Sequence, residues 1–528
     1  MRSLSYFWLV MLLTLSIALF SCGDDDDDDN DDSGTEDDDS TSDDDDGDDD
    51  AIDDDTGDDD TIDDDTIDDD TGDDDTGDDD TGDDDTEPGD YWKPSDVVPI
   101  GEHPLIRDQL VLRGIIHLHS VYSHDACDNR PFINGEPNER CLEQLRTAMC
   151  STNQQYIMLT DHDDPFSYYE FPDVLLYMED EGDELILNED EEPIANIISC
   201  EDGNTVYLTV GNENDLMPIS LDRMPAGTPE ERMALLGARD EAAVQGMRAL
   251  GATVLVNHAE QWTYEELAAL SIEGIEVYNL HANIDPSIRR DYLGLPYLGF
   301  VWPLLNFLLP AGESGHSDLI LLTFLAENTP SLENWDRLLA DRRMLGVLAT
   351  DAHRNSLPFP LWDGDRADSY RRMMRWFANY ILVDNYDLPD IEAAIAGGRM
   401  YGAFQVFGEP IGFDFYAETG KAVYEMGDEV ALAASPVIHV ALPELYRIDP
   451  TWGAPEMTIR LIRAGAEGGT VVAEETDQDL TYTVDQAGAY RVEVSIVPSH
   501  LEPVLGNNAD WFIHEYPLIY ANPIYVTD

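Results

Sequence analysis

Residues 113–126 read RGIIHLHSVYSHDA, an apolar run that ends in several imidazoles and a carboxylate. Side chains two residues apart on a β-strand point to the same face, so His117 and His119 would project side by side from a strand at GIIHLH. Imidazole and carboxylate groups gain little from burial, but together they are good metal ligands. The stretch therefore predicts a strand that carries two metal ligands at its carboxyl end.

Other apolar runs between residues 91 and 403 end in the same way. Strand-like runs at 156–163, 194–201, 252–259, 272–279 and 344–353 alternate with helical patterns at 139–149, 231–250, 263–270, 331–341 and 390–398. This alternation predicts an α/β fold with a parallel sheet or barrel, in which sites form at the carboxyl ends of strands. The polar residues expected at those ends are His117, His119, Asp161, His162, Glu201, His258, Asp351 and His353.

From about residue 404 the pattern changes to short alternating segments separated by turn residues. Examples are PVIHVALPEL (436–445), EMTIRLIRA (456–464) and AYRVEVSIV (489–497). They predict an antiparallel β-sandwich over 404–528. Its scattered His439, His500 and His514 are interpreted as structural or surface residues.

The ordered motifs HxH, TDH, a strand-end Glu, a His after VLVN, and DAH resemble the PHP (polymerase and histidinol phosphatase) superfamily over about residues 113–402. The resemblance implies a distorted (β/α)7 barrel around a phosphoesterase site with two or three metal ions. The sandwich and the late NPIYV stretch resemble those of bacterial PHP lipoproteins and carbamate-hydrolase-like relatives. The metal ligands that the resemblance implies are His117, His119, Asp125 (with His124 as the close alternative), His162, Glu201 as the bridging carboxylate, His258, Asp351 and His353.

The chain departs from the family pattern after the expected strand-end glutamate. Relatives often have a GHxN stretch there, whereas this chain reads GNEND, so Asn212 stands where an imidazole ligand would be. Either a third metal ion is absent, or Glu213, His281 or His316 supplies the ligand, although His281 is interpreted as structural. We expect two divalent ions, with a third left open, and the ligand types suit Zn²⁺, Mn²⁺ or Fe²⁺ without choosing among them.

Such ions can hold a bridging water, and hydroxide would then be the nucleophile of a hydrolase. Asp161 would orient His162 or receive a proton, and His124, or alternatively Tyr122, would protonate the leaving group. Arg354 and Arg399 are candidate anchors for an anionic substrate, although Arg399 fits a structural ion pair equally well. The sequence contains no P-loop, no GxGxxG after a strand and no Ser-His-Asp order, which leaves ATP, dinucleotide and serine-nucleophile functions without support.

The first 90 residues differ from the rest of the chain. Residues 1–22 have an early arginine, an apolar core and the ending LFSC, which resembles a lipoprotein signal peptide with Cys22 as the lipidated residue. An ordinary signal peptide is the alternative. Residues 23–90 are rich in aspartate and include seven (I/G)DDDT repeats, which predicts a disordered acidic linker rather than a calcium module. We expect a lipid-anchored protein of the bacterial envelope, and Gly23 after the anchor favours the outer membrane.

Cysteine and apolar patterns add two expectations. Export makes disulfides plausible, with Cys127 preferred as the partner of Cys141 and Cys150 as that of Cys200, while a cysteine-ligated zinc is the runner-up. Residues 292–312 carry no charge and could span a membrane, but three prolines and a place between strands favour a buried or loop-covering insertion. A further alternative is that this segment forms a lip at the membrane surface or at the substrate entrance.

Together these patterns predict a metal-dependent hydrolase, most simply a phosphoesterase acting on a small molecule. Hydrolysis of a carbamate, ester or amide at the same site is one alternative, and a non-catalytic surface binding lipoprotein is another. The formal net charge of -87 disfavours nucleic acid as a partner, because phosphates would be repelled. The sequence does not predict an oligomeric state.

Overall fold

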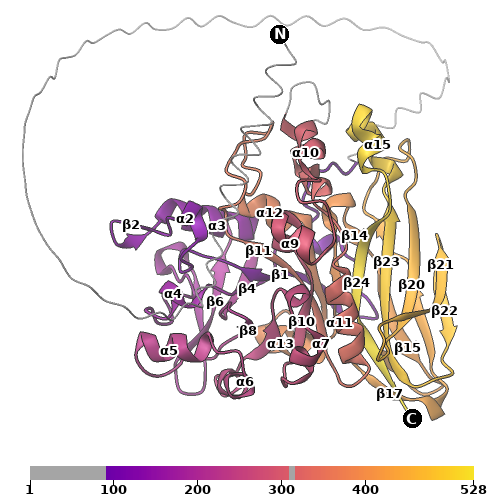
Figure 1. Cartoon of the computed structure of the whole chain (residues 1–528), viewed down its shortest axis with the longest axis horizontal. Helices are drawn as coiled ribbons and strands as arrows, with labels where there is room; N and C mark the ends of the chain where they lie inside the picture. The colour runs from indigo at the N-terminus through magenta and orange to yellow at the C-terminus, as the bar shows by residue number, and fades with distance from the viewer. Residues whose placement is uncertain (1–90, 309–315) are drawn as a thin grey trace, which may run out of the picture. The chain divides into compact units, whose positions relative to one another are not determined.

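Strand β1 (Leu110–Leu118) lies inside a large mixed sheet and pairs with three other strands (Figure 1). Its first half is antiparallel to β12 (Ala378–Val383), and its second half is parallel to β4 (Tyr156–Leu159) and to β11 (Leu345–Ala352). All of its residues except Leu110 are buried, as expected for a strand covered on both faces. The apolar run GIIHL at residues 114–118 therefore belongs to a central strand of the fold.

The computed structural model describes residues 91–308 and 316–528, which lie in one compact unit. The predictions for the signal peptide at 1–22, the linker at 23–90 and the anchor at Cys22 lie outside the described residues. The described part is a mixed α/β structure with one large sheet and additional antiparallel sheets.

Two runs of strands extend from β1. In one run, β4 is parallel to β7 (Thr205–Val210), which is antiparallel to β6 (Pro193–Ser199), and β5 (Glu184–Leu187) follows. In the other run, β11, β10 (Gly274–Asn279) and β9 (Thr253–Val256) are parallel, and β8 (Leu216–Ile219) is antiparallel to β9. Backbone hydrogen bonds from Leu221 N to Val210 O (2.8 Å) and from Asn212 N to Pro218 O (3.1 Å) connect the chain around β7 to that around β8.

Helices cover strands of the large sheet, with α6 against β9, α11 against β10, α12 against β11 and α13 against β12. Polar N-caps begin most of them, and Thr228 and Thr263 form complete capping boxes. The helix expected over 231–250 is two helices, because the chain turns at Gly237 and Asp240 caps a new start. The main helices are α3 (Glu139–Ser151), α5 (Pro229–Leu236), α6 (Glu241–Arg248), α7 (Tyr264–Ala268), α8 (Leu280–Ile284), α9 (Pro286–Asp291), α11 (Thr329–Leu339), α12 (Tyr370–Trp376) and α13 (Leu388–Gly397).

The C-terminal strands pair mainly antiparallel, although β17 (Glu429–Ala431) is parallel to the last strand of the chain. Strands β21 (Thr470–Thr476), β20 (Glu456–Arg463), β23 (Gly488–Val497) and β24 (Tyr516–Thr527) pair in that order. A second sheet has the order β16 (Val423–Glu425), β15 (Asp414–Glu418), β18 (Val437–Ala441) and β22 (Leu480–Thr483), and its Phe415, Ile438 and Val440 share a core with Ile459 and Leu461. Alternating burial along β15 and β18 shows that one face of this sheet points inward.

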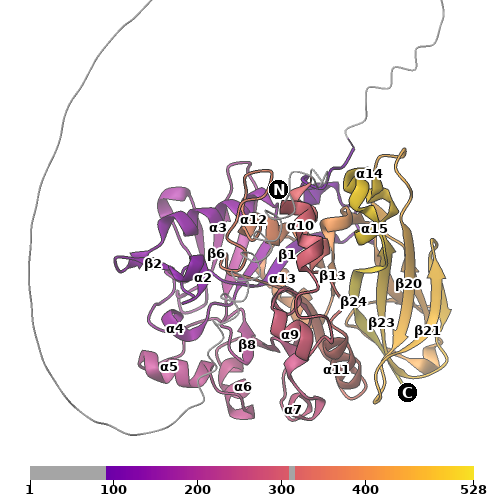
Figure 2. The ribbon, with the colours of Figure 1, turned by 45° about the horizontal axis from the view of Figure 1, so that its top comes forward.

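The large sheet continues from the α/β part into the C-terminal part. Strand β13 (Met400–Ala403) pairs with β12 on one side and with β24 on the other, so the last strand of the chain joins the two halves (Figure 2). The sequence pattern changes at about residue 404, and this position directly follows β13. The C-terminal part also contains two short helices that the sequence pattern did not indicate, α14 (Glu502–Leu505) and α15 (Ala509–Phe512).

Both predicted disulfides are present and confirm the preferred pairing. Cys127 is bonded to Cys141, and Cys150 is bonded to Cys200. The second bridge links α3 to the turn that follows β6, and the first closes the loop between α2 (Ala126–Asn129) and α3. The alternative prediction, a zinc ion bound by these cysteines, is therefore wrong.

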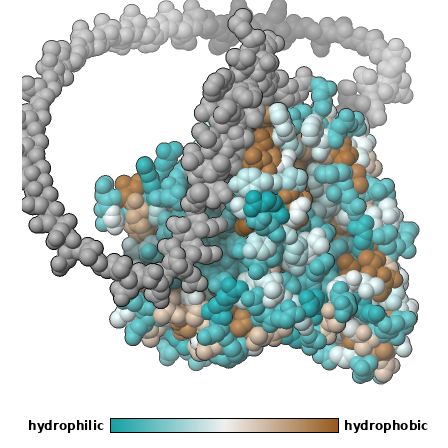
Figure 3. Space-filling model, in the orientation of Figure 1, coloured by the Kyte–Doolittle hydropathy of each residue, from teal (hydrophilic) through white to brown (hydrophobic). Residues whose placement is uncertain are grey.

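The described residues of the apolar segment at 292–312 include α10 (Val301–Leu308). Val301, Leu304, Leu305 and Phe307 are buried, while Trp302 is 64% exposed. Among the described residues no helix is both long and apolar enough to cross a membrane. On the face shown in Figure 3, hydrophobic residues form separate patches within a largely hydrophilic surface.

Candidate metal centre

The carboxyl ends of six strands deliver histidine and acidic side chains to one edge of the sheet. His117 and His119 come from β1, His162 follows β4 and Glu213 follows β7. On the other run of strands, His258 follows β9, His281 follows β10, and Asp351 and His353 come from the end of β11. Because parallel strands end at the same edge, residues that are far apart in the sequence meet there.

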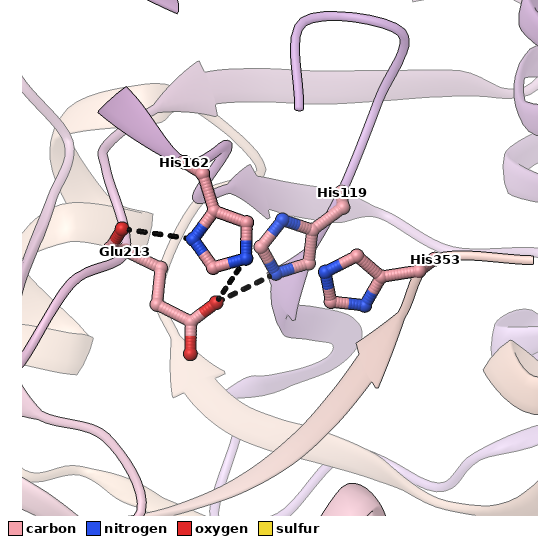
Figure 4. Close-up of side chains that lie close together, drawn as sticks. All are labelled: His119, His162, Glu213 and His353. Carbon is pink, nitrogen blue, oxygen red and sulfur yellow. Dashed lines mark hydrogen bonds and ion pairs between the residues drawn. The ribbon is translucent and has the colours of Figure 1, made fainter. Parts of the chain in front are cut away.

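Glu213 lies at the centre of this cluster. One of its carboxylate oxygens, Oε2, is 3.1 Å from His117 Nε2, 3.0 Å from His119 Nε2 and 3.6 Å from His162 Nε2. Its other oxygen, Oε1, is 3.4 Å from His258 Nε2. Figure 4 shows the carboxylate facing the imidazoles of His119 and His162, with His353 next to His119.

Asp351 is the second shared carboxylate. Its Oδ1 is 3.3 Å from His117 Nε2 and 3.2 Å from His353 Nδ1, and its Oδ2 is 3.3 Å from His258 Nε2 and 3.5 Å from His281 Nδ1. Ligand atoms thus gather in three overlapping groups. They are His119–His162–Glu213–His353, His117–His119–Glu213–Asp351, and His258–His281–Asp351.

Unusual backbone geometry places several of these side chains. His117, His258 and Asp351 have positive φ angles of 67°, 45° and 48°, which non-glycine residues rarely adopt. At His117 the register between β1 and β11 shifts, so the strand end is bulged rather than regular. Three ligand-type residues in this costly conformation are typical of a functional site.

Hydrogen-bond partners orient three imidazoles, and an ion-pair contact without a well-aligned hydrogen bond orients a fourth, that of His258, so that each directs its Nε2 atom into the cluster. His117 Nδ1 lies 2.5 Å from Glu276 Oε1, and His258 Nδ1 lies 3.4 Å from Glu260 Oε1. His119 Nδ1 lies 3.2 Å from Ser123 Oγ, and His162 Nδ1 lies 3.2 Å from the carbonyl oxygen of Glu213. Partners of this kind fix the tautomer that leaves a lone pair on Nε2 for a metal ion.

The electrostatics of the cluster favour cations. Burial alone would lower the pKa of His117, but the carboxylates of Glu213 and Asp351 raise it well above its usual value. Burial likewise opposes ionisation of Glu213 and Asp351, yet the neighbouring imidazoles hold both of their pKa values well below the usual range. His162 differs, because burial lowers its pKa to about 4 and keeps the ring neutral near pH 7.

The donor set fits divalent metal ions. Imidazole nitrogens and carboxylate oxygens converge within 4.8 Å in each group, which is the ligand mixture of zinc, manganese and iron sites. Asp351 Oδ1 and His353 Nε2 are buried and, among the described residues, make no well-aligned hydrogen bond although charged partners lie close. Buried polar atoms are normally paired, so their lone pairs are suitably placed for a cation.

Comparisons with known proteins give one structural likeness. Among solved structures, the chain is similar to a two-domain protein from Bacteroides vulgatus described as containing a predicted PHP-like metal-dependent phosphoesterase. The two share 11% sequence identity, the match covers 80% of this chain and 99% of that chain, and the TM-score is 0.34. No family model and no curated protein matches the sequence.

The structure brings seven of the eight expected ligand residues together. His117, His119, His162, His258, Asp351 and His353 lie in the three groups, and Asp125 lies beside them with Oδ2 3.1 Å from His353 Nε2. The adjacent imidazoles, above all that of His353, lower the pKa of Asp125 to about 2 against the effect of burial. His124, the alternative to Asp125, is exposed, and its ring lies 5.0 Å from that of His162.

The eighth, Glu201, is a correction. It lies in an exposed turn between β6 and β7 and contributes to none of the three groups. The physical reason is strand direction: β6 is antiparallel to β7, so its carboxyl end lies at the opposite edge of the sheet. Glu213, weighed from the sequence only as a substitute ligand, is the glutamate that belongs to two of the three groups.

Two expected catalytic side chains are held by neighbours. Asp161 is fully buried, and its two carboxylate oxygens accept hydrogen bonds from Ser120 N (2.5 Å) and Ser120 Oγ (2.6 Å), so it ties the ends of β1 and β4 together. Arg354 donates to Asp128, 3.2 Å away, at the rim of the site. Neither contact gives these residues a direct role in bond cleavage.

Sequence reasoning missed two carboxylates outside the ligand set and underrated one histidine. Glu276 and Glu260 orient imidazoles, and His281 faces Asp351 rather than serving only the fold. A signal for Glu276 was available, because an ionisable residue in the middle of the apolar stretch GIEVYN must find a partner when buried.

Proposed function

We propose that the protein is a metal-dependent hydrolase of the PHP type that cleaves a small phosphoester at a site with two or three divalent ions. The observation that carries the proposal is that Glu213 and Asp351 each belong to two of the three ligand groups. Carboxylates shared between neighbouring groups are suited to hold metal ions close together, as in two-metal phosphatases and nucleases. The order of the HxH, TDH and DAH motifs along the chain adds support through its resemblance to the PHP superfamily.

Divalent ions bound at these groups would act as Lewis acids and lower the pKa of water. The chain contributes orientation, because Glu276, Glu260, Ser123 and the Glu213 carbonyl fix the imidazoles before substrate arrives. His124 stands exposed beside His162 and can give a proton to the leaving group. Asp161 keeps the ends of β1 and β4 in place through Ser120.

We further propose that β1, β4, β7, β8, β9, β10 and β11 close into the distorted seven-stranded barrel of this family. The backbone hydrogen bonds between the ends of β7 and β8 support this closure. We also propose that Cys22 is lipidated, so that an acidic linker carries the enzyme at the bacterial envelope. Mass spectrometry of the mature N-terminus tests this, and an unmodified Cys22 would contradict it.

The test of the activity uses the full mature chain purified without chelator and loaded in turn with Zn²⁺, Mn²⁺ or Fe²⁺. Hydrolysis of p-nitrophenyl phosphate and bis(p-nitrophenyl) phosphate is compared with hydrolysis of p-nitrophenyl acetate and a p-nitrophenyl carbamate. We expect metal-dependent phosphoester turnover that is lost in Glu213→Gln and kept in Glu201→Gln, the same change at an exposed site. Turnover of only the acetate or the carbamate would indicate an ester or carbamate hydrolase in place of a phosphoesterase. Bound metal without any turnover would favour a binding protein.

A further inference from the structure

A cleft of about 500 Å³ lies in the C-terminal part of the described structure, with none of its lining residues in the three metal groups. One wall comes from strands β20, β23 and the start of β24, which lie side by side in Figure 2. The other wall is the loop 325–327 that precedes α11. The cleft is therefore shaped by both halves of the compact unit and is separate from the metal centre.

The charges in the cleft exclude an anionic ligand. Its one arginine, Arg460, is already paired with Glu474 (2.9 Å) and Glu515 (2.7 Å). Two further carboxylates, Glu327 and Glu493, line the cleft. Acceptor groups thus outnumber cations, so a phosphate or carboxylate ligand would be repelled.

Hydrogen-bonding groups of both kinds line the same walls. Arg460 Nη1 donates to Ser495 Oγ (3.1 Å), which places a guanidinium next to a hydroxyl, and Glu493 Oε1 accepts from Arg491 Nη1 (2.5 Å). The hydroxyls of Tyr516 and Tyr520 are buried and have no hydrogen-bond partner among the described residues. A ligand rich in groups that both donate and accept matches this mixture.

Apolar surface accompanies these polar groups. Leu325, Val494 and Pro517 contribute to the walls, and the exposed ring of His514 stands edge-on to that of Tyr516 with centroids 4.1 Å apart. Aromatic faces and small apolar patches pack well against the C–H surfaces of a ring that is otherwise polar.

We propose that this cleft binds a neutral saccharide. A sugar ring carries several hydroxyls, each a donor and an acceptor, together with an apolar C–H face, and it has no charge that Glu327 and Glu493 would repel. Neighbouring hydroxyls on such a ring suit the paired oxygens of a carboxylate. The proposed hydrolase would then be held at a glycan surface through its C-terminal part, independently of its metal ions.

The experiment applies the fluorescently labelled full mature chain to an array of neutral, sialylated and sulfated oligosaccharides, followed by calorimetric titration with the best neutral ligand. His514→Ala and Glu327→Ala alter exposed cleft residues. His439→Ala on the second sheet and Glu189→Ala in an exposed turn before β6 are the matched controls. Metal content and phosphoester turnover are measured on all four variants to show that they remain folded.

We expect binding to at least one family of neutral glycans, weakened about tenfold or more by each cleft variant and unchanged by each control, with metal content the same throughout. Binding to no arrayed glycan would overturn the proposal. Binding confined to sialylated or sulfated glycans would contradict the charge argument, and binding that survives both cleft changes would place the glycan site elsewhere on the protein.

Discussion

The Glu276→Gln variant tests how the protein prepares a metal ligand. Glu276 is fully buried in β10 and receives three donors: His117 Nδ1 at 2.5 Å, His258 N at 2.8 Å and Asn279 Nδ2 at 2.8 Å. The first donor bonds to Oε1, and the other two share Oε2. Glutamine has a single acceptor oxygen, so it cannot satisfy all three donors.

The least costly arrangement keeps the amide oxygen toward the two donors that share Oε2 and turns the NH2 group toward His117. That ring must then accept at Nδ1 and carry its proton on Nε2, the atom that faces Glu213 and Asp351. The lone pair of His117 Nε2 is then no longer available to a metal ion in the group His117–His119–Glu213–Asp351. Replacing outer partners of this kind typically lowers metal affinity 10- to 100-fold, which is about 1.4 to 2.8 kcal/mol.

The assay is competition for Zn²⁺ or Mn²⁺ against a chelator of known affinity, with metal content measured by mass spectrometry. Glu273→Gln is the matched control, because Glu273 immediately precedes β10 and pairs with Arg248 far from the ligand groups. We expect one ion to bind 10- to 100-fold more weakly in Glu276→Gln and with unchanged affinity in the control. Equal affinities in the two variants would refute the tautomer argument.

Two further predictions concern stability. Burial and the neighbouring Asp222 raise the pKa of Glu392 to about 7, so folding favours its protonated form, and its contribution to stability falls as pH rises from about 4.5 through 7. Glu392→Gln should remove a decline on the order of 1 to 2 kcal/mol between pH 5 and 8, measured by urea unfolding, and parallel pH profiles for the two proteins would contradict it. The Cys150–Cys200 bridge closes a longer loop than Cys127–Cys141, with separations of 50 and 14 residues, so its removal should cost about 4 kcal/mol against about 3 for the shorter loop. Thermal unfolding of the two Cys→Ser pairs measures this order, and a reversed order would count against the loop-entropy argument.

The part of the site that could be predicted from the sequence lies at strand ends with clear motifs. HLH, TDH and DAH each follow an apolar run, and all three runs are parallel strands whose carboxyl ends share one edge. His258 after VLVN was predictable for the same reason, because β9 is parallel to β10. Pattern and edge geometry were sufficient for these residues.

Glu201 shows where such reasoning fails. The sequences of β6 and β7 are similarly apolar. The residues before Glu201 do not indicate whether their strand is parallel or antiparallel to its neighbours. Direction is decided by pairing across the sheet, where β7 is parallel to β4 and β6 is antiparallel to β7. Strand pairing is a tertiary property, so the choice between Glu201 and Glu213 depended on contacts that a single sequence does not display.

The bulge at His117 and the left-handed backbone of His258 and Asp351 were also beyond sequence reasoning. None of the three is a glycine, and positive φ in such residues persists only where the surrounding structure holds it, as the hydrogen bond from His258 N to Glu276 Oε2 does for His258. The third group, His258–His281–Asp351, depends on this geometry. His281 lies in the first turn of α8, which begins directly after β10, and the pattern there did not decide between a ligand and a structural residue.

The most direct test of the central claim is the metal content of the full mature chain, purified without chelator, beside Glu213→Gln, Asp351→Asn and Glu201→Gln. We expect about two to three equivalents of transition metal in the unmodified chain and in Glu201→Gln, because Glu201 lies outside the three ligand groups. We expect a loss of at least one equivalent in Glu213→Gln and in Asp351→Asn, since each carboxylate belongs to two groups. Metal content near zero, or the same in all four proteins, would contradict a metal centre built on Glu213 and Asp351.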